Sequence, residues 1–190
     1  MAAGPAAADA LAAALWADTV RAIGDATMAG VVPTSEIEAL EASAREGHGV
    51  LSAAAPGPWP AAKARSHSPT IFVDEAHGGA HVPTVVTVSA SHEMEPGHFV
   101  GMVWAKDGAG RILAARKFTG AEGRRPELAF TVTGDAKTLQ LINGSGGLVV
   151  HGFAWCSKHG LWASEPVRVE NRGWKTPQRL TAVLSNMKKA

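Results

Sequence analysis

The stretch ASHEMEPGHF (residues 90–99) places two imidazoles, His92 and His98, on either side of two carboxylates and a Pro-Gly pair. Metal ligands on one face of a helix lie three or four residues apart. A separation of six residues does not fit this spacing, and Pro96 and Gly97 would break a helix in any case. We therefore expect the two imidazoles to converge from a bent loop.

The single cysteine, Cys156, lies in the segment AWCSKHGLW, with His159 three residues later. A thiolate and an imidazole at this spacing can both reach one metal ion, and Gly160 permits a tight turn after them. Zinc-ribbon and thioredoxin-like sites need a C-x-x-C pair, so a single cysteine argues against them. It also excludes c-type haem attachment and an internal disulfide framework. Taken alone, the pair is more typical of a buried structural cysteine beside a surface histidine.

Short β-like segments, separated by glycine and polar turns, must position these residues. We predict strands at residues 70–73, 82–90, 99–106, 111–118, 127–133, 138–142 and 148–155. About seven strands at this spacing favour a mainly β fold, an antiparallel β-sandwich.

The region before residue 56 is rich in alanine and favours helices. Apolar residues recur at roughly helical spacing over residues 8–28, and a second helix is predicted to begin at Ser35, which forms a capping box with Glu38. Gly47 is its expected end. We therefore predict an N-terminal helical hairpin (1–56) for packing or oligomerisation, a Pro-rich linker (57–64), a β-sandwich (65–170) and a C-terminal tail (171–190).

The overall charge limits the partners that the sequence favours. The formal net charge is +1, which gives no electrostatic reason to expect binding to nucleic acid or to an anionic membrane. No apolar run is long enough to span a bilayer. The first residues lack the early Lys or Arg of a secretory signal, so we expect a cytoplasmic protein.

Three segments occur in the order SHSPTI, HEMEPGHFV and CSKHGLW. In this order and at these separations the chain resembles the superoxide reductases, the family of neelaredoxin and the desulfoferrodoxin iron domain. The family patterns are K-H-x-P-x-I, H-P-M-E-E-x-H-Y-I and C-N-x-H-G-L-W, and five of the seven positions of the last one match here. The resemblance covers about residues 65–168.

The resemblance implies an immunoglobulin-like sandwich that holds one non-haem iron per chain. Its equatorial ligands would be four histidines and its axial ligand the thiolate of Cys156; the histidines are His67, His92, His98 and His159. The sixth position would be left for superoxide, which the enzyme reduces to hydrogen peroxide with electrons from an external donor. Imidazole suits ferrous iron, and a thiolate pushes electron density through the metal. The carboxylates of the loop, Glu93 and Glu95, are then expected to face solvent or to support contacts around the site.

Two further histidines near the first motif, His77 and His81, leave the ligand set open. The interval from His67 to His92 has room for two strands and a turn, whereas the interval from His81 has room for one, so we favour His67 and treat His77 and His81 as turn residues near the site. His48 and His151 are treated as non-ligands.

The residues before the first histidine depart from the family pattern. The family has Glu-Lys there, and this chain has Arg65 and Ser66. Arg65 or Lys63 could supply the positive charge instead, or both could be surface residues. Two alternatives therefore remain: another non-haem iron enzyme that uses oxygen or thiols on the same scaffold, and a non-enzymatic iron-binding or interaction module. The sequence identifies no catalytic residue besides the ligands, and it leaves homo-oligomer formation open.

Overall fold

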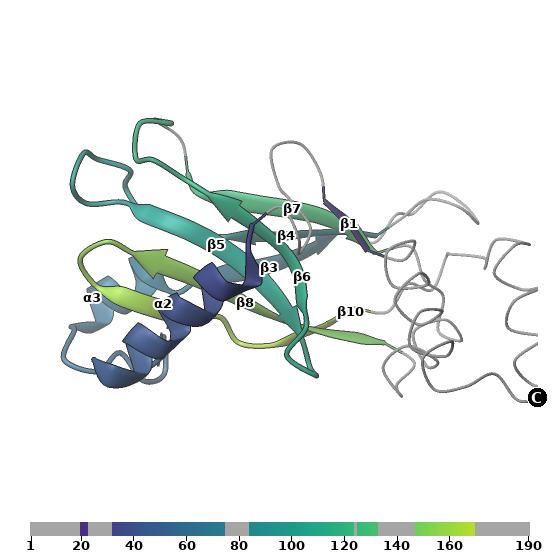
Figure 1. Cartoon of the computed structure of the whole chain (residues 1–190), viewed down its shortest axis with the longest axis horizontal. Helices are drawn as coiled ribbons and strands as arrows, with labels where there is room; N and C mark the ends of the chain where they lie inside the picture. Colours follow the sequence, from purple (N-terminus) through teal and green to yellow (C-terminus); the bar gives the residue numbers. More distant parts are fainter. Residues whose placement is uncertain (1–19, 23–31, 75–83, 124, 133–146, 170–190) are drawn as a thin grey trace, which may run out of the picture.

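Two β-sheets pack face to face in the computed structural model, which describes residues 20–22, 32–74, 84–123, 125–132 and 147–169 (Figure 1). The described part of the chain is mainly β, with two helices. None of the described helices has the length and apolar character needed to cross a membrane.

The smaller sheet has four strands, in the order β1-β7-β4-β3. Their bounds are Val20–Ala22 for β1, Glu127–Val132 for β7, Thr84–Ser89 for β4 and Thr70–Asp74 for β3. All three pairings in this sheet are antiparallel.

The larger sheet has the order β2-β9-β8-β5-β6, and β10 pairs with β8 beside this path. The bounds are Leu51–Ser52 for β2, Gly160–Ala163 for β9, Leu148–Cys156 for β8, Val100–Asp107 for β5, Ile112–Lys117 for β6 and Val167–Val169 for β10. The end of β8 pairs with β9 and its beginning with β10, so these two short strands share one edge of β8. The β2–β9 pairing is parallel, so the larger sheet is mixed rather than purely antiparallel as predicted.

The alternation of side chains along β8 explains how the chain builds its core. Leu148, Val150, Ala154 and Cys156 are buried on the inner face, together with valines and Phe130 of the smaller sheet. The period-2 pattern arises because successive side chains of a strand point to opposite faces. It carries Cys156, the last residue of β8, to the buried face at one end of the sandwich.

The two helices lie beside the larger sheet (Figure 1). Helix α2 (Thr34–Glu46) packs Ile37 and Leu40 against Trp104 of β5 and Leu161 of β9, on the face opposite the main core. Helix α3 (Ala61–His67) is a short segment that ends immediately before β3. It buries Ala64 against Trp162 of β9.

Six of the predicted strands are confirmed as β3 to β8, and the predicted strand at 138–142 lies outside the described residues. The helix predicted for residues 8–28 is wrong at residues 20–22, where β1 pairs with the edge of β7; the rest of that segment lies outside the described residues. Hydrogen bonding to an open sheet edge here overrides a weak local helical pattern.

The capping box is also wrong. Helix α2 begins at Thr34 with Pro33 as its N-cap residue and no side-chain cap, so Ser35 is already inside the first turn. Gly47 ends the helix as predicted, with its backbone N–H donating to the carbonyl oxygens of Ser43 and Ala44. In the segment predicted as a Pro-rich linker, residues 61–64 form the beginning of α3.

Candidate metal centre

Four separate parts of the fold each contribute to one side-chain cluster. His67 is the last residue of α3, just before β3 begins. His92 lies in the loop after β4, and His98 lies just before β5. Cys156 ends β8, and His159 lies in the turn to β9.

The loop that carries His92 and His98 bends at Pro96 and Gly97, as predicted. Glu95 and His98 exchange both backbone hydrogen bonds, with N···O distances of 3.2 and 3.0 Å, which closes a two-residue turn. Gly97 has φ = +79°, a conformation that a residue with a Cβ atom rarely adopts. The turn sends the chain back toward β8, where the backbone N–H of Ser157 donates to the carbonyl oxygen of Phe99.

The turn after β8 brings the thiol and the last imidazole together. Cys156 pairs with Gly160 across the turn, and Gly160 has φ = +77°. The backbone carbonyl of His159 accepts a hydrogen bond from the indole nitrogen of Trp162, which is fully buried. The C-x-x-H spacing therefore corresponds to a tight turn between two paired strands.

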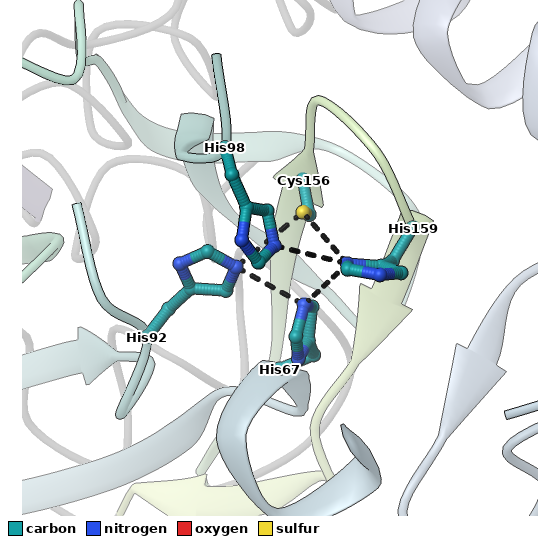
Figure 2. Close-up of side chains that lie close together, drawn as sticks. All are labelled: His67, His92, His98, Cys156 and His159. Atoms are coloured by element: carbon teal, nitrogen blue, oxygen red, sulfur yellow. Dashed lines mark hydrogen bonds between the residues drawn. The ribbon is translucent and has the colours of Figure 1, made fainter. Parts of the chain in front are cut away.

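All five potential ligand atoms lie within 4.8 Å of one another (Figure 2). His67 Nε2 is 2.8 Å from His159 Nδ1 and 3.0 Å from His92 Nε2, and His98 Nε2 is 3.1 Å from His159 Nδ1. Cys156 Sγ is 3.4 Å from both His92 Nε2 and His159 Nδ1. Three imidazoles thus present Nε2 to the cluster, and His159 presents Nδ1.

Backbone carbonyl groups fix the tautomers of two of these rings. His67 Nδ1 lies 3.0 Å from the carbonyl oxygen of Lys63, and His92 Nδ1 lies beside the carbonyl oxygen of Glu93. Because a carbonyl can only accept, each Nδ1 carries the proton and donates it, and each Nε2 is left with a bare lone pair. Two lone pairs therefore face each other across 3.0 Å with no proton to share. A cation among these atoms would remove the repulsion between them.

The nitrogen separations also fit a single metal ion. With metal–nitrogen bonds of about 2.1 Å, neighbouring nitrogens at right angles lie about 3.0 Å apart, whereas tetrahedral ligands lie about 3.4 Å apart. The observed separations of 2.8, 3.0 and 3.1 Å match the right-angled arrangement. The donor set therefore fits a metal with a square arrangement of imidazoles better than a tetrahedral structural zinc site.

Burial keeps the four imidazoles neutral. Desolvation is the main cause that lowers the pKa of His67 to about 3 and that of His159 to about 4, and it also lowers the pKa of His92 and of His98. Burial raises the pKa of the Cys156 thiol, while the backbone groups of Lys158 and His159 oppose that rise. Neutral imidazoles can offer lone pairs to a metal, and a coordinated thiol loses its proton.

Among the residues before His67, Lys63 is the cation that acts on the cluster. Its charge lowers the pKa of all four imidazoles and of Cys156. Arg65 is exposed and is not among the main causes of these shifts. Ser66 donates from Oγ to the Lys63 carbonyl, and the same Oγ lies 2.8 Å from His67 Nδ1.

The structure brings together all five residues that the sequence singled out, and Glu93 and Glu95 are exposed. His77 and His81 lie outside the described residues, and His48 and His151 are not part of the cluster. Two contributions were missed: the carbonyl of Glu93, which leaves no signal in a sequence, and the helical placement of Lys63. Residues four apart on a helix lie on the same face. A helix predicted over residues 61–67 would therefore have placed Lys63 beside His67.

Comparison with solved structures finds superoxide reductases. The superoxide reductase (neelaredoxin) from Ignicoccus hospitalis is 19% identical with a TM-score of 0.47, and the match covers 66% of this chain and 95% of that one. The superoxide reductase from Nanoarchaeum equitans is 16% identical with a TM-score of 0.42, and the match covers 63% and 99% of the two chains. No match was found among curated proteins.

Residues 60–165 match the desulfoferrodoxin family. This segment is more than half of the 190 residues, and it contains the whole side-chain cluster. With the three motifs in order and their histidines and cysteine gathered at one point of the fold, the chain belongs to the desulfoferrodoxin family.

Proposed function

We propose that this protein is a superoxide reductase-like oxidoreductase that holds one iron ion per chain and reduces superoxide to hydrogen peroxide. The residues that would hold the iron are the imidazoles of His67, His92, His98 and His159 and the thiolate of Cys156, on a scaffold with immunoglobulin-like connectivity. The observation that carries the proposal is the pair of bare Nε2 lone pairs of His67 and His92, 3.0 Å apart beside a thiol. The two lone pairs repel each other when no cation lies between them. A bound cation would remove this repulsion.

The order of the rings supports a square plane. His67 has His92 and His159 as neighbours, and His98 has His159 as a neighbour. The rings of His67 and His98 are nearly parallel, with centroids 5.9 Å apart, as expected for ligands on opposite sides of one ion. Cys156 Sγ is equally distant from His92 and His159, which also stand opposite each other in this order.

Each part of the chain has a distinct role in the reaction. Bound iron would supply one electron by cycling between the ferrous and ferric states. The thiolate of Cys156 would donate electron density to the bound iron. The carbonyl groups of Lys63 and Glu93 hold two imidazoles, those of His67 and His92, in the tautomer that can bind a metal. The ammonium group of Lys63 attracts the superoxide anion. Superoxide takes up one electron and two protons to give hydrogen peroxide, and an external one-electron donor returns the electron.

The direct test is to mix pulse-generated superoxide with the reduced, iron-loaded protein. The proposal predicts a fast bimolecular oxidation of the protein and one hydrogen peroxide per superoxide consumed, without dioxygen. Dioxygen release would indicate dismutation instead. If the ferrous protein is stable and does not react with superoxide, the proposal is wrong. That result would favour another iron enzyme or a non-enzymatic iron-binding module.

A further inference from the structure

Trp59 lies one residue before the segment that matches the family, and its indole ring contacts His159 in the side-chain cluster. The ring stands edge-on to the imidazole of His159, with centroids 4.7 Å apart and planes at 87°. It also makes an edge contact with the exposed ring of His48, at 6.0 Å. A residue from the N-terminal region is therefore in direct contact with a proposed ligand.

The backbone around Trp59 is fixed to the strand that begins after His159. Strand β2 pairs with β9, and Leu51 is in register with Trp162. The backbone N–H of Trp59 donates to the Pro56 carbonyl at 3.2 Å. Gly57 has φ = +61°, and a Cβ atom there would lie 2.8 Å from Leu51 Cδ2, so the turn packs closely on Leu51.

The indole ring itself is held by packing. Trp59 packs against a buried cluster of Leu51, Ala64 and Trp162. Its indole nitrogen is buried and makes no hydrogen bond within the described part of the chain. The useful property of Trp59 is therefore its flat aromatic surface, which another aromatic ring could supply.

His159 lacks the support that orients two of the other imidazoles. Hydrogen bonds from Nδ1 to backbone carbonyls hold His67 and His92. Among the described residues, no such bond from the outer ring nitrogen holds His159, and a half-turn of its ring would replace Nδ1 by a carbon atom. A hollow of about 120 Å³, lined in part by His159, Trp155 and Gly47, leaves space beside the ring.

We propose that Trp59 is a positioning residue of the metal centre, which holds the imidazole of His159 with Nδ1 turned toward the other ligand atoms. The inference rests on the proposed metal site. It extends that site beyond the family segment: residues 51–59, which begin with β2 paired to β9 and end with the indole of Trp59, complete the metal centre. Metal-ligating histidines depend on such outer contacts for affinity.

The test is a titration of the metal-free, full-length chain with Co²⁺, followed by the absorption of the cobalt–thiolate bond. Trp59→Leu is expected to weaken Co²⁺ binding about tenfold or more, because the aromatic edge contact is lost. Trp59→Phe is expected to bind nearly as tightly as the wild type, since it keeps a ring and loses no hydrogen bond. Equal affinities of Trp59→Leu and the wild type would overturn the inference.

Leu113→Ala is the control, because it removes packing from the main core, a different buried cluster from the one that holds Trp59. Urea unfolding of each metal-free variant measures the general loss of stability. The inference requires Trp59→Leu to lose more Co²⁺ affinity than Leu113→Ala at a similar loss of stability; equal losses of affinity would assign Trp59 a purely structural role and overturn the inference. If the wild type gives no cobalt–thiolate absorption, the metal site itself fails and this inference with it.

Discussion

The proton positions on His67 and His92 determine what the cluster can do. Both rings give their Nδ1 proton to a backbone carbonyl, so the lone pairs that remain point at each other. These two contacts are made by main-chain atoms of Lys63 and Glu93, so they survive substitution of either side chain. The Lys63 side chain is therefore free to serve the electrostatics of the site without disturbing the ligand that its own carbonyl orients.

We predict that Lys63→Ala slows the bimolecular reaction with superoxide and weakens its dependence on salt. A single cation should contribute about twofold to fivefold, below the roughly tenfold or more of a whole charged cleft. Pulse radiolysis at several ionic strengths measures the effect, because salt screens such attraction. Arg65→Ala is the matched control, since Arg65 is exposed and is not among the main causes of the pKa shifts in the cluster. A larger effect of Arg65→Ala would move the attracting charge to that residue.

We also predict that Ser66→Lys, which restores a cation at the position where the family has lysine, speeds this reaction. The optical spectrum of the iron should be almost unchanged, because Ser66 is not a proposed ligand. A flat rate in this variant would mean that the charge of Lys63 already provides the attraction.

At the scale of elements, each proposed ligand lies at the end of a strand or helix or in the turn or loop beside it. The inner-face alternation of β8 buries Cys156 at 1% exposure, and the tight turn to β9 brings His159 beside it. The turn at Pro96 and Gly97 likewise brings His98, just before β5, into the cluster. Rigid strands thus hold short turns, which is how five side chains from distant parts of the sequence meet.

The Pro-Gly turn leads to a prediction about the free energy of unfolding. Gly97→Ala should destabilise the metal-free protein by about 1–2 kcal/mol, because a residue with a Cβ atom is strained at positive φ. No atom lies within 4 Å of the added Cβ, so the cost is conformational rather than steric. Gly47→Ala is the control, since Gly47 has φ = −96° and only ordinary contacts around a Cβ. Urea unfolding of both variants measures the difference, and equal free energies of unfolding would contradict the prediction.

Helix α3 ends at His67, the proposed ligand for which the sequence left His77 and His81 as alternatives. We predict that His67→Ala weakens iron binding more than the roughly tenfold to hundredfold loss typical of outer contacts, whereas His77→Ala and His81→Ala bind nearly as the wild type. Iron content and affinity across the three variants decide the point. If His81→Ala emptied the site while His67→Ala kept it, the first ligand would be misassigned.

Across the whole molecule, the sequence predicted which side chains gather in one cluster better than it predicted the elements around them. The resemblance of three short motifs to a known family singled out the five clustered residues, and short β-like segments between glycine and polar turns predicted β3 to β8, because both signals lie in local sequence. Strands β1, β2 and β10 are two or three residues long and form only by pairing with a distant partner, so no local pattern marks them. The sequence did not predict the contact of Trp59 with His159 for the same reason, since this contact depends on the pairing of β2 with β9.

The central claim is that these five residues hold one iron ion through a thiolate. Metal analysis and the visible spectrum of the protein, purified without added metal and then oxidised, test it most directly. We predict close to one iron per chain and a strong thiolate-to-iron absorption band, which Cys156→Ser abolishes while the fold survives. A colourless protein that contains zinc, or a band unchanged in Cys156→Ser, would contradict the account.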